Sequence, residues 1–196
     1  MEEQQKKPKI LVTDFTEKAV ASIIAELEII EITYPSNQIV LVQIDSYGGA
    51  SDGLSMIYDK LKSMGNPIMT YTSSKAMSAG AILLATAASK NMRFASPEAN
   101  ILIHEVQTGT GGDIKDMEDQ MAFTRVVNDR WMKILAKSMG LKSAADVRAL
   151  IKKKAIGQDV YLTAHQAVQL KIIDAVASIK MVPSYGWDLI VLKPNR

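Results

Sequence analysis

The sequence predicts a single α/β domain built around a parallel sheet. Its first half alternates short apolar, β-branched runs with segments whose apolar residues recur at helical spacing, in the order strand, helix, strand, helix, strand, helix. Strands joined by helices in this way cross over and run parallel. The second run, Gln38–Ile44 (QIVLVQI), is apolar on both faces, which is typical of a strand buried within a parallel sheet. Functional sites in such sheets form at the carboxyl ends of the strands.

The elements can be placed in chain order from their start and stop signals. Asp14 and Glu17 predict a helix start, Pro35 and Gly65 predict helix ends, and Thr163 opens a capping box. Strands are predicted at 10–12, 38–44, 68–71, 92–95, 100–104, 159–162 and 172–176, and helices at about 14–30, 54–61, from 78 onward, 114–139, 143–154 and 163–170. Residues 1–9 are expected to be a mobile N-terminal tail, 10–180 one domain, and 181–196 a C-terminal tail.

Composition excludes several classes of protein. With 196 residues, 47% of them hydrophobic, the chain can bury one substantial core. A net charge of +2 gives no electrostatic case for binding nucleic acid. The absence of cysteine rules out disulfides, thiolate metal sites and a cysteine nucleophile. The start, MEEQQKKPK, is too polar for a signal peptide, and no apolar run approaches the ~20 residues of a membrane span. A cytoplasmic protein is therefore expected.

One glycine-rich segment could pass for a phosphate cradle. Gln107–Asp113 (QTGTGGD) has the flexibility of such a loop, but it lacks GxGxxG spacing and no Lys-Ser or Lys-Thr pair follows it. Nucleotide binding is therefore not predicted. Neither a cofactor nor a metal is expected.

The strongest functional signal is a serine at a strand-to-helix junction. Thr70–Ala88 (TYTSSKAMSAGAILLATAA) begins as the end of a strand and becomes a helix at Ser78. A hydroxyl at this position faces the unpaired N–H groups and the positive dipole of a helix N-terminus, which stabilise a developing anion. Ser78 as a simple N-cap is the structural alternative, and Ser-Ala-Gly taken alone favours it.

A nucleophilic serine needs a base, an acid that orients the base, and N–H donors for the oxyanion. The chain has two histidines. His104 ends an apolar strand at the same sheet edge as Ser78, whereas His165 lies in the first turn of a helix and is expected on the surface. Asp159 precedes a later extended segment. From the residues alone, His104 as a core histidine and Asp159 as a loop carboxylate remain open.

Taken together, these segments resemble the proteolytic subunit of Clp protease, a family of serine peptidases. Four stretches carry the resemblance in order: an oxyanion loop, a nucleophile helix, a strand ending in histidine, and an aspartate segment. They read Ser46-Tyr47-Gly48-Gly49, Lys75–Ala85 (KAMSAGAILLA), Arg93–His104 (RFASPEANILIH) and Asp159–Ala164 (DVYLTA). Tyr47 stands where the family has a proline. The resemblance covers roughly residues 10–177.

The resemblance implies a spiral of β-β-α units with a protruding handle, residues 107–139. It implies that Ser78 is the nucleophile, His104 the general base and Asp159 the orienting acid. The backbone N–H groups of Gly49 and Ala79 would then form the oxyanion hole.

The resemblance also implies how the protein works with partners. The expected enzyme is an ATP-dependent endopeptidase that cleaves unfolded polypeptides or short peptides inside one or two heptameric rings. An AAA+ unfoldase is the expected partner, and neither nucleic acid nor a membrane is involved. Two alternatives remain open: a crotonase-type acyl-CoA enzyme, with Glu98 and Glu105 as the glutamates near the site, and a catalytically silent ring subunit.

Overall fold

A computed structural model describes residues 6–109, 111–154 and 159–192. Within these ranges the chain forms six helices and nine strands, and the strands make two sheets. The large sheet contains, in spatial order, β1 (Lys9–Val12), β2 (Val40–Ile44), β3 (Ile68–Thr72), β5 (Arg93–Ala95), β8 (Ala175–Val182) and β9 (Gly186–Val191). The small sheet contains β4 (Lys75–Met77), β6 (Asn100–Ile103) and β7 (Val160–Thr163). The helices are α1 (Glu17–Thr33), α2 (Ser51–Ser63), α3 (Ala79–Thr86), α4 (Ile114–Met139), α5 (Ala144–Lys154) and α6 (Ala164–Gln169).

The chain repeatedly passes from the large sheet to the small sheet and then into a helix. It runs from β3 to β4 to α3, and from β5 to β6 to α4. Strands β1, β2, β3, β5 and β8 pair in parallel, and β9 is antiparallel to β8. In the small sheet β4 is parallel to β6, and β7 is antiparallel to β6. The predicted α/β class with β-β-α units is therefore confirmed.

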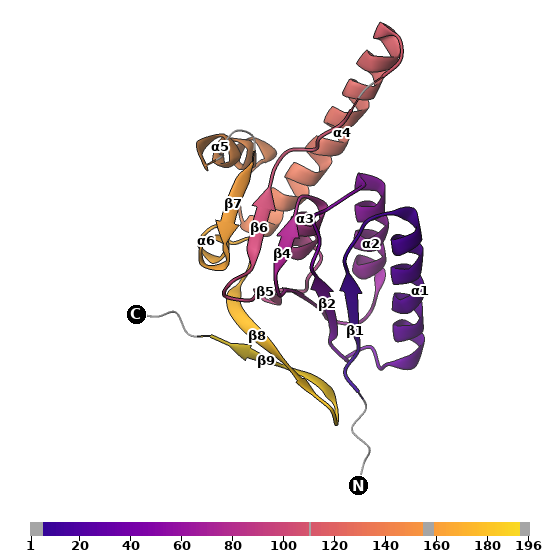
Figure 1. Cartoon of the computed structure of the whole chain (residues 1–196), viewed down its shortest axis with the longest axis vertical. Coiled ribbons are helices and arrows are strands. Elements are labelled where there is room, and N and C mark those ends of the chain that lie inside the picture. The colour runs from indigo at the N-terminus through magenta and orange to yellow at the C-terminus, as the bar shows by residue number, and fades with distance from the viewer. Residues whose placement is uncertain (1–5, 110, 155–158, 193–196) are drawn as a thin grey trace.

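Helices α1 and α2 lie side by side against the β1–β2 end of the large sheet (Figure 1). The main core lies between helices and sheets and includes Leu27, Ile57, Leu83 and Leu135. A second apolar cluster on the large sheet comprises Leu41, Met69, Tyr71, Phe94, Ala177 and, from β9, Trp187. Every residue of β3 is buried, including Thr70 and Thr72, as expected for an interior strand of a parallel sheet that is covered on both faces. No helix in the described ranges combines the length and apolarity needed to cross a membrane.

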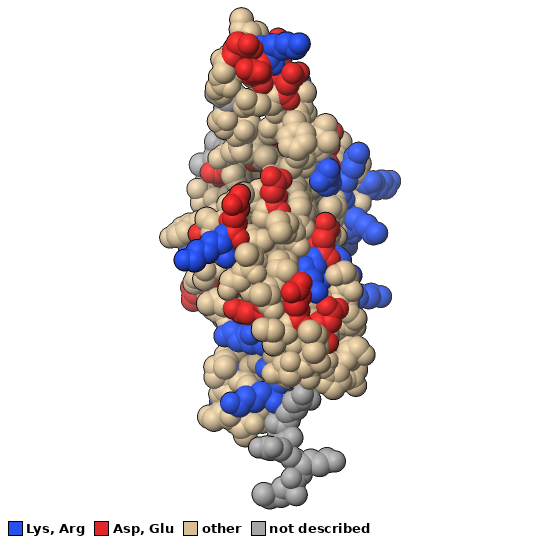
Figure 2. Space-filling view, turned by 90° about the vertical axis from the view of Figure 1, so that its right-hand side faces the viewer, with Lys and Arg blue, Asp and Glu red and all other residues tan. Residues whose placement is uncertain are grey.

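Helix α4 projects from the body of the molecule as the expected handle (Figure 1). Its bounds match the prediction because both ends carry strong signals: Asp113 caps the start, and Gly140 ends the helix in the left-handed conformation at φ 70°. Only its second half joins the core, through side chains that include Trp131 and Leu135. The projecting first half exposes apolar side chains at Ile114, Met121, Phe123 and Val126. Its free end, at the top of Figure 2, is rich in acidic side chains.

The two chain ends differ from the prediction. Instead of a strand at 172–176 and a C-terminal tail from 181, β8 and β9 form an antiparallel hairpin that continues to Val191. The hairpin also holds the N-terminal segment: Lys7 N donates to Tyr185 O at 2.9 Å, and Lys7 Nζ lies 4.9 Å from the centre of the Trp187 ring. A mobile tail is therefore wrong for residues 7–9. Residues 1–5 and 193–196 lie outside the described residues.

Candidate active site

Ser78 sits in a strained backbone conformation between β4 and α3. Its φ of 51° and ψ of −120° lie outside the regions that non-glycine residues normally occupy. Neighbouring strands hold this geometry, because Ser78 N donates to Leu102 O at 2.9 Å and Met77 N donates to Ser46 O at 3.0 Å. Ser78 occupies the N-cap position of α3, yet its side chain makes no capping bond. The N-cap position of the structural alternative is confirmed, but the capping hydrogen bond is not formed, so the hydroxyl is available for other chemistry.

Strand β4 ends directly before Ser78, and the Asp45 carboxylate holds the turn that precedes this strand. Asp45 Oδ1 accepts from the N–H groups of Ser73 at 3.0 Å and Ser74 at 2.8 Å, and Oδ2 accepts from Gln43 Nε2 at 2.6 Å. Partial burial acts to raise the pKa of Asp45, but these hydrogen bonds outweigh it and hold the pKa below its ordinary value. The ionised carboxylate thus stabilises the turn that leads from β3 into β4.

The Gly48-Gly49 loop packs directly against Ser78. A Cβ on Gly48 would lie 2.7 Å from Ser78 Cβ and 2.8 Å from Met77 O, and Gly48 has a φ of +103°. Only glycine combines that backbone conformation with so close an approach. The predicted oxyanion donors lie beside this contact: the N–H groups of Gly49 and Ala79 donate no hydrogen bond within the part of the chain that the structure describes. The role of these two donors stays a prediction, and sequence reasoning missed the close contact that Gly48 makes with Ser78.

His104 and Asp159 meet at the end of the β6–β7 ladder. The last pair in the antiparallel register is Ile103 with Val160, so the next two residues lie opposite each other. His104 Nδ1 and Asp159 Oδ1 are 3.7 Å apart, which is longer than a hydrogen bond. Both atoms are buried and, among the described residues, neither has a hydrogen-bond partner. The other carboxylate oxygen of Asp159 accepts from the hydroxyl of Tyr161 at 3.4 Å.

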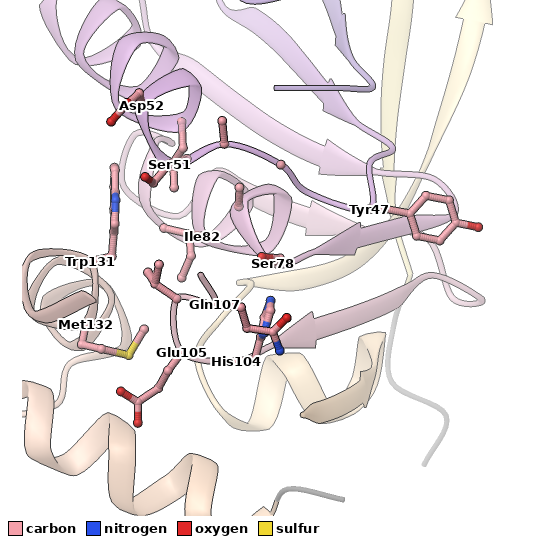
Figure 3. A pocket seen from close by; sticks show the side chains of 15 residues that line it. Tyr47, Ser51, Asp52, Ser78, Ile82, His104, Glu105, Gln107, Trp131 and Met132 are labelled. Atoms are coloured by element: carbon pink, nitrogen blue, oxygen red, sulfur yellow. The ribbon is translucent and has the colours of Figure 1, made fainter. Parts of the chain in front are cut away.

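Ser78 and His104 line the same cavity, which has a volume of about 520 Å³. Figure 3 shows Ser78 and His104 at one end of this cavity and Trp131 and Met132 of α4 at the other, with Ile82 of α3 between them. Within the described chain the Ser78 hydroxyl makes no hydrogen bond. The structure thus brings Ser78 to His104 and His104 to Asp159, without closing the hydrogen bonds between them. Such bonds are often long in unliganded enzymes and tighten when substrate binds.

Helix α4 contributes side chains to the site that sequence reasoning did not identify as site residues. Asn128, Trp131 and Met132 fall at helical spacing on one face, and this spacing is the signal that could have pointed to a shared role. Trp131 and Met132 line the cavity. Tyr47, expected to be part of the oxyanion loop, is 74% exposed, and Lys75 Nζ lies 4.5 Å from its ring centre. His165 is exposed, as expected.

The two glutamates that a crotonase-type reaction would use are poorly placed for it. Glu105 Oε2 already accepts hydrogen bonds from Asn128 Nδ2 and, at 3.2 Å, from Arg148 Nε. Glu98 is exposed and does not line the cavity. A carboxylate that acts as a general base must reach the reacting proton unobstructed, and neither glutamate does so in this arrangement.

The described chain is an α/β fold in which a serine and a histidine line one cavity, and comparison with known proteins identifies the family. The family model described as Clp protease matches residues 3–180. The chain is 32% identical over 174 residues to the ATP-dependent Clp protease proteolytic subunit 1 of Protochlamydia amoebophila, covering 86% of this chain and 79% of that relative. It is 31% identical over 168 residues to the protein of the same name from Chlamydia abortus, covering 82% of this chain and 81% of the relative. The chain belongs to the Clp protease family.

Proposed function

We propose that this Clp-type serine peptidase uses Ser78 as nucleophile, His104 as general base and Asp159 as the acid that orients the base. One observation carries the proposal. Ser78, whose side chain makes no capping hydrogen bond, shares a cavity with His104, and His104 Nδ1 lies 3.7 Å from the Asp159 carboxylate. With Nδ1 directed to Asp159, the other ring nitrogen, Nε2, is left for the serine. This is the division of roles that a Ser-His-Asp triad requires.

In the proposed reaction Ser78 Oγ attacks the carbonyl carbon of the scissile peptide bond. His104 Nε2 takes the hydroxyl proton and then delivers it to the leaving amine, which breaks the C–N bond and leaves an acyl-serine. Water, deprotonated by the same nitrogen, hydrolyses the acyl-serine. Asp159 holds the imidazole in the tautomer that carries a proton on Nδ1 and stabilises the imidazolium form.

The oxyanion that forms in both steps would be held by the backbone N–H groups of Gly49 and Ala79. Two properties support this role. The Ala79 N–H lies at the start of α3, where the helix dipole favours negative charge, and Gly49 lines the same cavity as Ser78 and Ala79. Neither N–H group is engaged elsewhere in the described chain. Donors that are fixed before reaction stabilise the transition state without reorganising, which is commonly the largest single contribution to catalysis.

We also propose that substrates are unfolded polypeptides or short peptides, cleaved inside an assembly of heptameric rings and supplied by an AAA+ unfoldase. The names of the relatives describe ATP-dependent proteolytic subunits, which supports an ATP-driven partner. The exposed apolar side chains of Ile114, Met121, Phe123 and Val126 on α4 support contact with further copies, because apolar surface on two sides of a projecting helix is costly to leave in water. Phe123→Ser should lower the particle mass measured by light scattering, and an unchanged mass would contradict this contact.

Hydrolysis of a fluorogenic peptide by purified protein tests the triad. The wild-type protein and the Ser36→Ala control, which changes an exposed serine remote from the cavity, should both hydrolyse the peptide. Ser78→Ala should reduce the rate to background. Retained hydrolysis in Ser78→Ala would overturn the proposed nucleophile.

A further inference from the structure

The segment that carries His104 leaves the small sheet immediately after its last paired residue. The β6–β7 ladder ends at Ile103 and Val160, and residues 104–107 continue outside the regular strand. Val106 and Gln107 line the cavity together with His104. The position of the base therefore depends on what holds this short segment in place.

Helix α4 holds it through the side chain of Asn128. Val106 N donates to Asn128 Oδ1 at 3.0 Å, which attaches the segment two residues beyond His104 to the buried half of the helix. The Asn128 amide is itself oriented, since its Nδ2 donates to Glu105 Oε2. With the nitrogen fixed toward a carboxylate, the oxygen must face Val106, so the amide has one satisfactory orientation.

A third element completes the arrangement. Arg148 of α5 donates from Nε to Glu105 Oε2 at 3.2 Å and from Nη2 to Asp129 Oδ1 of α4. Glu105 adjoins His104 in the chain, so the guanidinium of Arg148 fixes a carboxylate directly beside the base. Charge-assisted hydrogen bonds of this kind are stronger than neutral ones. Asn128, Glu105 and Arg148 thus form one polar clamp across the base-bearing segment, α4 and α5.

We propose that Asn128 is a positioning residue for His104, an inference that rests on the proposed role of His104 as general base. The His104 Nδ1 to Asp159 Oδ1 distance of 3.7 Å must shorten to about 3 Å for a hydrogen bond to form. A segment anchored at Val106 keeps the imidazole within that reach, whereas an unanchored one can drift away from both Asp159 and Ser78. Misplacement by about 1 Å can cost a hundredfold in rate, so a single anchoring bond has a measurable effect.

Kinetics of three single variants measure the effect. Asn128→Ala removes both hydrogen bonds of the side chain, whereas Asn128→Asp loses the bond to Glu105 and places two carboxylates side by side. Each variant should lower kcat about tenfold, with KM changed by less than about twofold. The control Arg130→Ala changes an exposed side chain two positions along the same helix and should leave both constants unchanged. Wild-type kcat in Asn128→Ala would overturn the inference.

Exchanging the hydrogen-bond donor and acceptor between positions 128 and 105 distinguishes a positioning role of Asn128 from a general loss of stability. Asn128→Asp keeps the acceptor for Val106 N but sets two carboxylates against each other at Glu105. Adding Glu105→Gln supplies an amide N–H at position 105 that can donate to the new carboxylate at position 128, the reverse of the wild-type direction. The amide oxygen at position 105 can still accept from Arg148. The double variant Asn128→Asp/Glu105→Gln should therefore regain kcat to within about threefold of wild type. Additive losses in the double variant would contradict the clamp.

Hydrogen exchange tests the anchor without relying on activity. The Val106 amide should exchange at least tenfold faster in Asn128→Ala than in wild type, while protection in β2 and β3 should stay unchanged. If Val106 protection is the same in both proteins, the inference fails even where peptide hydrolysis is normal. If wild-type protein does not hydrolyse peptides but Val106 loses protection in the variant, the proposed function fails and the anchor stands.

Discussion

His104 and Asp159 face each other across the open end of the β6–β7 ladder, with 3.7 Å between Nδ1 and Oδ1. Both atoms are buried and lack a hydrogen-bond partner among the described residues. Buried polar atoms without partners are costly, so this pair gains by closing to hydrogen-bond distance. The antiparallel register determines this placement, because His104 follows Ile103 and Asp159 precedes Val160, and Ile103 pairs with Val160. Backbone pairing thus brings together His104, the proposed base, and Asp159, the proposed acid.

Removing the base should abolish activity, whereas removing the other histidine should not. We expect His104→Ala to lower kcat by roughly 10⁴- to 10⁶-fold, in the range found for triad residues elsewhere. His165→Ala is the matched control, because His165 is exposed on α6 and does not line the cavity. Steady-state hydrolysis of a fluorogenic peptide measures both. Equal activity in the two variants would remove His104 from the mechanism.

Tyr161 should assist Asp159 through its hydroxyl alone. The hydroxyl donates to Asp159 Oδ2 at 3.4 Å and leaves Oδ1 directed at His104. Tyr161→Phe keeps the ring and deletes this bond, so kcat should fall roughly three- to tenfold with little change in KM. An unchanged kcat, or a change confined to KM, would show that the hydroxyl does not orient the carboxylate.

Gly48 should be intolerant of a single added methyl group. Gly48→Ala would bring Cβ to 2.7 Å from Ser78 Cβ and would strain a backbone with φ +103°, so both peptide hydrolysis and melting temperature should fall sharply. Gly65→Ala is the control, since its nearest neighbour would be Ser36 Cβ at 3.6 Å. Thermal melts and hydrolysis rates of both variants check the prediction. It is wrong if the two variants behave alike.

Asp45 should make stability depend on pH in the acid range. Its pKa is lower in the folded chain than in the unfolded one, so folding favours the ionised carboxylate. The stabilisation is complete above the unfolded pKa of about 3.9 and is lost as pH falls through the lower folded pKa. Asp45→Asn should therefore melt well below wild type at pH 7, and the gap should narrow as pH falls toward about 3. A gap that is constant with pH would contradict this role.

The sequence predicts most of the elements because their signals are local. Asp113 and Gly140 mark both ends of α4, and the Thr163–Gln166 capping box is present at the start of α6. Strand β4 was missed, since Lys75-Ala76-Met77 has no β-branched residue and pairs only with distant segments. The terminal hairpin was missed for a similar reason. Pro183 and Gly186 mark its turn, but Trp187 finds its place only in a cluster assembled from β2, β3, β5 and β8.

The candidate site was also predictable only in part from the sequence. Ser78, His104 and Asp159 could be proposed from their places beside predicted strands, and the family resemblance gave each its role. The Asn128 and Arg148 contacts could not be predicted, because they join residues 22 and 43 positions from their partners. The strained backbone of Ser78 and the contact with Gly48 also arise from tertiary packing, which overrides local preference.

Covalent labelling of Ser78 tests the central claim most directly. Purified protein incubated with a fluorophosphonate should gain the mass of one adduct per chain, and peptide mass spectrometry should locate it on Ser78, because only an activated serine reacts at a useful rate. The adduct should be absent in Ser78→Ala and formed far more slowly in His104→Ala. An adduct on a different serine, or equal labelling of wild type and His104→Ala, would contradict the account.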